Sequence, residues 1–327
     1  MKMWLRNCLS AMAGQRRDAG LHQPVMADVV AELLITDNKG IYLDLTAGGG
    51  GHLLVLASRL DSSARIYGAD VDPEAVERTG RALNATSQFR GVLHTAFADI
   101  GRAVRGIEED RFDGILLDLG ISSYQLDDST RGIAFRFDGP LDMRFDPSSG
   151  TSAADLVNRL PEDELRKILR EYGEERQAAG IAGAIVKERQ RGMILTTTQL
   201  REIVLLVVKP PHETKALARV FQALRIAVNR ELEQLSCVLP VALSILKPGG
   251  RLAVISYHSL EDRIVKRFFQ QEVKGRCTCP PELPQCVCGA TSTMKMVTRH
   301  PLAPSDSEIA SNSRARSARL RVAERLA

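Results

Sequence analysis

The 327-residue sequence has no apolar run long enough to cross a lipid bilayer, so we expect no membrane-spanning helix and no membrane partner. It also lacks the continuous apolar stretch of a secretory signal near its start, and we therefore expect a cytoplasmic protein. Residues 1–21 contain three arginines and one acidic residue, Asp18. We interpret them as an N-terminal extension, which is either an organellar transit peptide or a frayed or misassigned start.

Cysteine is too scarce for a disulfide scaffold, because the whole chain has six cysteines. Four of them form two C-x-C pairs in "CTCPPELPQCVCG", and four thiolates in so short a span can hold a tetrahedral zinc ion, although the usual pairs are spaced more widely. A structural zinc knuckle and reduced cysteines without metal both remain open, and a catalytic metal is not expected. The four residues are Cys277, Cys279, Cys286 and Cys288.

An excess of one charge is nearly absent as well, since 44 basic and 40 acidic side chains leave a net charge of +4. This balance permits a polyanionic partner without requiring one, so the positions of the basic residues matter more than their total. Two groups of arginines are candidates for phosphate contacts, although a solvated strand face would explain the second group equally well. They are Arg131, Arg136 and Arg144 in the central loop (residues 131–146), and Arg314, Arg316, Arg319 and Arg321 near the end of the chain.

Short apolar segments alternate with helical patterns in the first third of the chain. This alternation predicts a doubly wound parallel sheet with helices on both faces. Two late segments are expected to add strands at its edge. The predicted strands are residues 41–45, 64–70, 91–96, 112–120, "KPGGRLAVISYHS" (247–259), "TMKMVTR" (293–299) and "ARLRVAERL" (318–326).

Residues 127–214 have helical patterns and no convincing strand, which predicts a helical insertion in a core made of residues 22–126 and 215–327. Pro161 and Gly173 are expected to flank one of its helices.

Two further boundaries are expected around the end of this insertion. Thr198 is expected to cap a helix that ends before Lys209 and Pro210. A long helix over residues 215–246, interrupted at Pro240, then leads back to the sheet.

The turn "AGGGGH", residues 47–52, follows the first predicted strand. A phosphate-binding P-loop needs Lys and then Ser or Thr after its last glycine, but His52 and Leu53 follow here. A dinucleotide fingerprint needs a third glycine three places after the second, and this chain has leucine there. What remains is a backbone that a small ligand can approach closely. Asp70 ends the second strand about 20 residues later, where an acidic residue can accept hydrogen bonds from a ribose. S-adenosylmethionine has a ribose and no pyrophosphate, but a tight turn with Asp44 and Asp70 merely solvated stays an open alternative.

Ligands of such sheets bind outside the carboxyl ends of the strands. The glycine turn, Asp70, Phe97 and Asp118 therefore belong to one crevice. The long loop that follows Asp118 is rich in Asp, Gly, Arg and aromatic residues, and its length and position favour a functional role.

Six segments follow one another along the chain: "HQPVM" (22–26), "DLTAGGGGH" (44–52), "DLGISSYQLD" (118–127), "RGIAFRFDGPLDMRFD" (131–146), "YHSLEDR" (257–263) and "PSDSEIASNSRARSARLR" (304–321). Together they resemble the signatures of the ribosomal RNA small-subunit methyltransferase H family. The resemblance implies a Rossmann-like class I S-adenosylmethionine-dependent methyltransferase sheet that carries a helical insertion domain. The chain departs from the usual family pattern at three places: Ile133-Ala134 stands where the family usually has Phe-Ser, Phe145 where it has Met, and Tyr257 where it has Phe. These replacements are apolar or nearly isosteric.

The same resemblance implies transfer of a methyl group from S-adenosylmethionine to the exocyclic N4 of a cytidine in the decoding region of 16S, or small-subunit, ribosomal RNA. The expected partner is this RNA within the ribosomal subunit, not DNA, and a homodimer is one open option for the oligomeric state. The implied cofactor contacts are Gly50, Gly51, His52, Asp70, Phe97, Asp118 and Gln125.

The chemistry calls for hydrogen-bond acceptors, because the N4 lone pair is shared with the cytosine ring and acceptors must draw on its protons. Asp118, together with the carbonyl of Leu119, occupies the place of the Asp/Asn/Ser-Pro-Pro-aromatic segment of many amino methyltransferases, but the prolines are missing. Asp142 and His258 are alternative residues on the substrate side. The missing prolines leave a second hypothesis, a catalytically inactive protein that binds cofactor and RNA.

Overall fold

The computed structural model describes residues 23–107, 111–275, 279–280, 283 and 287–327. The expected N-terminal extension therefore lies outside the described residues, as do Cys277 and Cys286 of the cysteine cluster. Among the helices of the described ranges, none combines the length and the apolarity that a membrane span requires.

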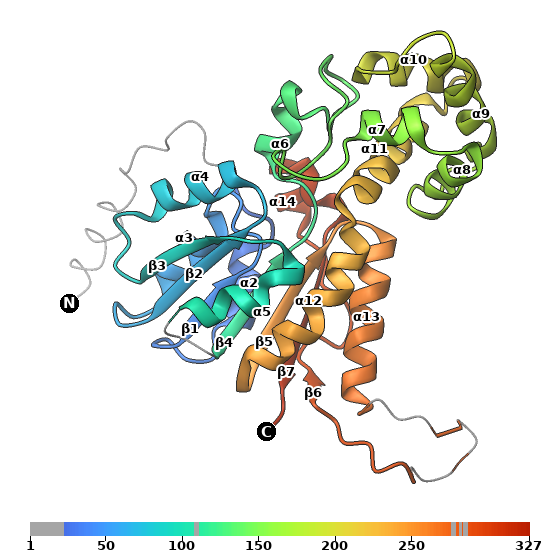
Figure 1. The fold of residues 1–327 in the computed structure, drawn as a ribbon. Coiled ribbons are helices and arrows are strands. Elements are labelled where there is room, and N and C mark those ends of the chain that lie inside the picture. The colour runs from blue at the N-terminus through green and yellow to red at the C-terminus, as the bar shows by residue number, and fades with distance from the viewer. Residues whose placement is uncertain (1–22, 108–110, 276–278, 281–282, 284–286) are drawn as a thin grey trace.

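In this part of the chain, seven strands form one sheet in the order β3-β2-β1-β4-β5-β7-β6 (Figure 1). Pairing is parallel from β3 through β5, whereas β7 runs antiparallel to both β5 and β6. The predicted Rossmann-like sheet and its predicted strands are confirmed, with ends shifted by a few residues. The strands are β1 (Ile41–Asp44), β2 (Arg65–Asp70), β3 (Phe89–His94), β4 (Phe112–Asp118), β5 (Leu246–Ser256), β6 (Met294–Met296) and β7 (Arg319–Arg325).

Helices cover both faces of the sheet, because side chains alternate between the two faces along each strand. Leu43 of β1 packs in an apolar cluster with α5, α12 and α13, whereas its neighbour Tyr42 packs with α2, α3 and α4. These buried layers hold the carboxyl ends of the strands in place. The helices are α2 (Ala27–Leu34), α3 (Gly51–Arg59), α4 (Pro73–Leu83), α5 (Ile100–Ala103), α12 (Glu231–Ile245) and α13 (Ser259–Val273).

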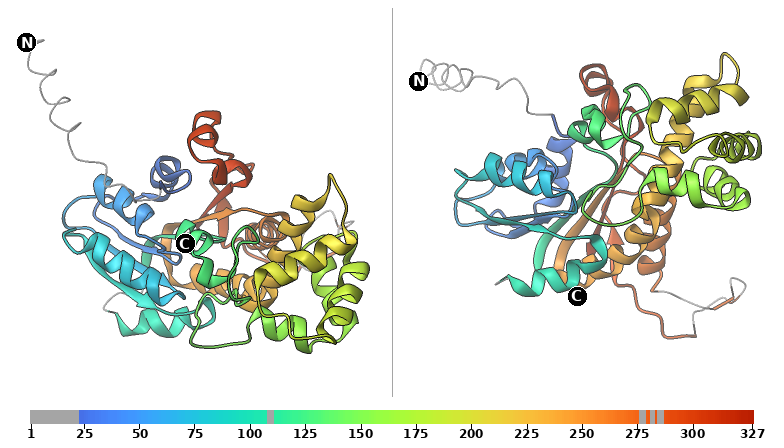
Figure 2. Two further views of the ribbon diagram at one scale, coloured as in Figure 1. Left: turned by 90° about the horizontal axis from the view of Figure 1, so that it is seen from above. Right: turned by 45° about the horizontal axis from the view of Figure 1, so that its top comes forward.

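A separate helical cluster lies beside the carboxyl edge of the sheet (Figures 1 and 2). Residues 127–214 contain no strand, as predicted, and Pro161 and Gly173 flank α8 as predicted. The apolar core of this cluster also includes Ala216 to Leu224, so α11 starts in the cluster and continues toward the sheet. The helices are α7 (Ala153–Arg159), α8 (Glu162–Glu171), α9 (Ala178–Arg189), α10 (Thr197–Val207) and α11 (Glu213–Asn229).

The predicted interruption of the long helix at Pro240 is wrong. The helix breaks at Arg230, between α11 and α12, where the backbone takes a left-handed φ of 51°. Pro240 lies inside α12 and has no N–H to donate to the carbonyl of Ser236, four residues earlier. Both residues are exposed. Water can hydrate that carbonyl, which makes the proline tolerable, whereas the sequence gives no sign that an arginine will adopt a left-handed conformation.

The predicted cap of α10 at Thr198 is also wrong, because Thr196 is the capping residue. Its hydroxyl accepts a hydrogen bond from the Gln199 backbone N–H at 3.2 Å, and the Gln199 side chain accepts one from the Thr196 N–H at 3.0 Å. This reciprocal pair requires a spacing of three residues. Three consecutive threonines begin at Thr196, so residue type alone could not distinguish among them.

Gly50 provides a test of the turn that leads from β1 into α3. It has a φ of 82°, and a Cβ atom there would lie 2.8 Å from Cδ1 of Leu83. Gly50→Ala should lower the free energy of unfolding by about 2 kcal/mol, because left-handed strain and crowding act together. Urea unfolding followed by circular dichroism measures the change.

Gly192→Ala is the matched control for this prediction. No heavy atom outside its immediate chain neighbours lies within 4 Å of the Cβ position there, and its φ is outside the left-handed region. The control should therefore unfold at the wild-type urea concentration or slightly above it. Equal stability of Gly50→Ala and the control would show that the turn is not constrained as described.

Candidate active site

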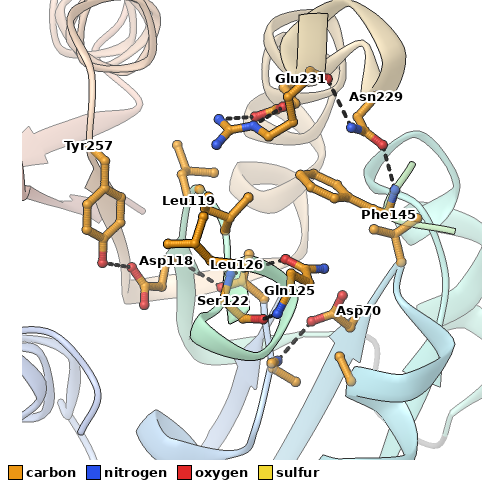
Figure 3. A pocket seen from close by; sticks show the side chains of 18 of the residues that line it. Asp70, Asp118, Leu119, Ser122, Gln125, Leu126, Phe145, Asn229, Glu231 and Tyr257 are labelled. Atoms are coloured by element: carbon orange, nitrogen blue, oxygen red, sulfur yellow. Dashed lines mark hydrogen bonds and ion pairs between the residues drawn. The ribbon is translucent and has the colours of Figure 1, made fainter. Parts of the chain in front are cut away.

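A cavity of about 570 Å³ lies at the carboxyl ends of the parallel strands (Figure 3). The glycine turn after β1 and the loop after β4 form one side of it. The residues after β5 and the junction of α11 with α12 form the other side. Open α/β sheets bind ligands at this edge, and the volume is in the usual range for small-molecule sites.

Most of the site residues predicted from the sequence line this cavity. Two of them do not. Gly50 lies behind the turn against Leu83, and both carboxylate oxygens of Asp142 accept hydrogen bonds from Arg144 at 2.7 to 2.8 Å. The lining residues among those predicted are Gly51, His52, Asp70, Phe97, Asp118, Gln125 and His258.

Asp70 ends β2 and faces the cavity opposite Tyr257 (Figure 3). Its Oδ2 accepts a hydrogen bond from the Gly48 N–H at 2.8 Å, and its Oδ1 accepts one from the Asp72 N–H at 2.9 Å. Burial raises the pKa of Asp70 to about 6, although these bonds oppose that shift. Each oxygen retains a second acceptor position, so the carboxylate can still bind hydroxyl groups of a ligand.

Gln125 is held by the protein itself. Its Nε2 donates to Oδ2 of the fully buried Asp72 at 2.9 Å, and its Oε1 accepts from the Ser122 N–H at 3.1 Å. Arg131 donates to the same Asp72 oxygen at 3.0 Å and is itself buried. The prediction of Arg131 as a phosphate contact is therefore wrong, since a guanidinium buried against a carboxylate cannot reach the phosphates of an RNA at the surface.

Two side chains hold the carboxylate of Asp118 at the end of β4. The Tyr257 hydroxyl donates to its Oδ1 at 2.8 Å, and Nε2 of His52 lies 3.2 Å from its Oδ2. Burial lowers the pKa of His52, but the neighbouring Asp118 carboxylate outweighs this effect, so the pKa lies above its ordinary value. The backbone N–H of Asp118 also donates to the Thr46 hydroxyl at 2.7 Å, which fixes the start of the loop.

Asp44 lies beneath the glycine turn and is almost completely buried. Its Oδ1 accepts hydrogen bonds from the backbone N–H and the hydroxyl of Thr46, while its Oδ2 is buried without a hydrogen-bond partner. Burial raises the pKa of Asp44 to about 6. The alternative that treated Asp44 as a solvated strand end is therefore wrong.

The far wall of the cavity contains charged residues that the sequence did not reveal. Arg225 near the end of α11 donates two hydrogen bonds to Glu231 at the start of α12, at 2.8 and 2.9 Å, and both side chains are largely buried. Nε2 of His258 lies 3.1 Å from Oε1 of the buried Glu261. Burial raises the pKa of Glu261, but the hydrogen bond and the charge of His258, together with weaker neighbouring interactions, outweigh this effect. The pKa of Glu261 therefore lies below its ordinary value. No sequence signal marks the Arg225–Glu231 pair, because it forms across the unexpected helix break.

Two of the departures from the family pattern face this cavity. Tyr257 supplies the hydroxyl that binds Asp118, a contact that phenylalanine could not make. Phe145 also lines the cavity, and its backbone N–H donates to Asn229 Oδ1 at 2.8 Å (Figure 3). The central loop is thus tied to the end of α11.

In the described part of the chain, one group of His, Cys and acidic side chains could bring ligand atoms within 4.8 Å of one another, namely Glu231, His258 and Glu261. Arg225 and His258 already pair with the two carboxylates, so we do not interpret this group as a metal site. The zinc hypothesis for the late cysteines remains a prediction, because two of the four lie outside the described residues.

Comparison with known proteins places this geometry in a family. Residues 19–326 match the model of the MraW methylase family. Three similar relatives are each named ribosomal RNA small subunit methyltransferase H. Those from Heliobacterium modesticaldum, Geobacter sp. and Syntrophotalea carbinolica are 45%, 47% and 47% identical; the alignments cover 93%, 93% and 95% of this chain and 98%, 98% and 99% of the relatives. The chain therefore belongs to the MraW methylase family.

Proposed function

We propose that this protein transfers a methyl group from S-adenosylmethionine to the exocyclic N4 of a cytidine in the decoding region of small-subunit ribosomal RNA. The methylase family and the names of its relatives support the reaction and the class of substrate. The observation that carries the proposal is the placement of Asp70 and Asp118, at the ends of β2 and β4, in one cavity. Relatives named as methyltransferases give no support to the alternative of an inactive binding protein.

The residues present fit S-adenosylmethionine. Asp70 offers free acceptor positions for the ribose hydroxyls, and Phe97 offers apolar surface near the end of β3. The glycine turn brings its backbone to the cavity wall, since a Cβ on Gly49 would lie only 3.1 Å from the Tyr124 ring and one on Gly51 3.2 Å from Pro24. When bound, S-adenosylmethionine supplies an electrophilic methyl group on its sulfonium.

Asp118 has the position and the support that the acceptor chemistry needs. Tyr257 and His52 hold its two oxygens and leave other lone pairs for the amino protons of the base. The carbonyl of Leu119, which also lines the cavity, is our second acceptor. Fixed acceptors turn the nitrogen lone pair toward the methyl group and lower the entropic barrier. This support replaces the missing prolines in our proposal, and His52 contributes through Asp118.

We assign the target base to the substrate side of the cavity. His258 and the Arg225–Glu231 pair lie there, opposite the glycine turn. A base reaches such a cavity only when it is splayed out of the folded RNA. The ribosomal subunit as the context of the RNA, the cytoplasmic location and a homodimer remain predictions, as does a recognition role for the helical insertion.

Asp70→Ala should weaken binding of S-adenosylmethionine by about 1.5 to 3 kcal/mol, the scale of hydrogen bonds to a charged group. Isothermal titration calorimetry measures this affinity directly. Asp61→Ala is the control, because Asp61 lies before the opposite, amino end of β2 and its side chain accepts hydrogen bonds from the backbone N–H and the hydroxyl of Ser63. If the Asp70 variant binds as tightly as the control, Asp70 does not hold the cofactor.

Asp118→Asn should reduce methyl transfer by about two to three orders of magnitude, because the amide keeps the shape but loses the carboxylate acceptor. Asp118→Ala should in addition weaken cofactor binding. Tyr257→Phe removes one neutral hydrogen-bond donor and should reduce turnover by about tenfold or less. The assay is transfer of labelled methyl groups to small ribosomal subunits, with cofactor affinity measured in parallel. Wild-type turnover in Asp118→Asn would remove Asp118 from the mechanism.

A further inference from the structure

Two arginines from distant parts of the chain share one exposed carboxylate at the mouth of the cavity. Asp127 is the last residue of α6 (Ser123–Asp127), and the residues just before it line the cavity. Nη2 of Arg136 lies 2.5 Å from its Oδ1, and Nη2 of Arg314 lies 3.2 Å from its Oδ2. Arg314 also lines the cavity itself. One carboxylate is thus shared by two guanidinium groups.

Arg136 also stacks on an exposed aromatic ring. Its guanidinium carbon lies 4.9 Å from the centre of the Phe137 ring, and Phe137 is 38% exposed. The backbone here is fixed to α10, because the Phe137 carbonyl accepts from the Thr197 hydroxyl at 2.7 Å and the Gly139 carbonyl accepts from the Thr197 N–H at 3.0 Å. The ring is therefore held at the surface by a rigid segment.

A second groove, of about 390 Å³, continues from this stack between the central loop and the helices α10 and α11. Its charged residues are Arg136, Arg201 and Glu213, and its apolar residues include Phe135, Leu205 and Leu217. In Figure 1, α6 lies above α14 (Asp306–Ser311), to one side of the helical cluster. Cationic and aromatic groups thus lead from the cavity mouth onto the helical cluster.

We propose that this surface, the arginine–phenylalanine track, binds the unpaired RNA strand next to the target nucleotide. The track consists of Arg314, Arg136, Phe137 and Arg201. Arginines that bind phosphates beside an aromatic ring that stacks a base are the usual chemistry of single-strand recognition. The inference rests on the proposed function, because the strand must pass the cavity mouth while its neighbouring base is inside.

Asp127 occupies the arginines in the free protein and competes with the RNA. Ion pairs between exposed side chains are weak, so a phosphate group can displace the carboxylate. The carboxylate also repels any phosphate that approaches. Removing its charge should therefore strengthen RNA binding, whereas a purely structural carboxylate would, on removal, leave binding unchanged or weaken it.

The test measures the affinity of the full-length protein for a single-stranded RNA of the decoding-region sequence and for small ribosomal subunits, over a range of salt concentrations. Asp127→Asn should bind the RNA about two- to fivefold more tightly than wild type, from the usual strength of exposed ion pairs. Arg136→Ala and Arg314→Ala should each lower the slope of log affinity against log salt by about one. Phe137→Leu should weaken binding about tenfold, because it keeps apolar bulk and loses stacking.

Glu77→Gln and Arg81→Ala are the matched controls. These residues form an exposed ion pair on α4, away from the track, and their removal makes the same changes of charge. The controls should bind RNA as wild type does apart from small changes due to net charge. Cofactor affinity and thermal stability should be unchanged in both controls and in the Asp127, Arg136 and Phe137 variants, whose side chains do not line the cavity.

Weaker or unchanged RNA binding by Asp127→Asn, or wild-type binding by Phe137→Leu, overturns the proposal. Loss of small-subunit binding by the arginine variants with unchanged affinity for the RNA would assign the surface to a ribosomal protein and would also overturn it. Methyl transfer by the wild-type protein is assayed on the same subunits. Its absence alongside the expected RNA binding would reject the proposed function and leave the track supported.

Discussion

The buried carboxylate of Asp72 joins the parts of the chain that surround the cavity. It accepts hydrogen bonds from the Glu74 N–H at the start of α4, from Gln125 of α6, and from Arg131. Arg131 in turn donates to the Phe145 carbonyl at 2.6 Å, which ties in the far end of the central loop. Removing one partner of a buried ion pair leaves an uncompensated charge and typically costs about 3 to 5 kcal/mol. The shape of the cavity therefore depends on this carboxylate, although it is not among the residues that line it.

A second attachment fixes the same loop from the opposite side. Asn229, at the end of α11, donates to the Met143 carbonyl at 2.8 Å and accepts from the Phe145 N–H at 2.8 Å. The protein's own hydrogen bonds thus hold the loop at both the β2 side and the helical side. Such preorganisation means that less ordering entropy is lost on binding.

The sequence predicted those parts of the site that depend on local pattern. Asp70 and Asp118 follow apolar strands, and the ends of parallel strands meet at one edge, so their meeting could be foreseen. The contacts of Asp72 with Arg131, and of Arg225 with Glu231, join residues whose approach depends on how whole elements pack, and no local pattern encodes them.

Backbone conformation set a second limit on prediction from the sequence. The break at Arg230 was missed because proline is the usual sign of a helix end, and a left-handed arginine has no such sign. The cap of α10 is a different case, because the spacing does mark it: of the three threonines, Thr196 alone has a glutamine three residues later.

Because α11 is continuous, the helical cluster and the cavity are connected by one rigid element. One uninterrupted helix has Phe221 in the core of the cluster and Arg225 and Asn229 in the cavity wall. A helix rises about 1.5 Å per residue, so Phe221 and Arg225 lie about one turn apart on α11. A shift or rotation of the helix inside the cluster therefore moves the wall residues as well. The apolar side of α11 belongs to the core of the cluster, so a division of the chain at residue 214 separates side chains that pack together. Changes in how the cluster packs therefore also change the geometry of the cavity wall.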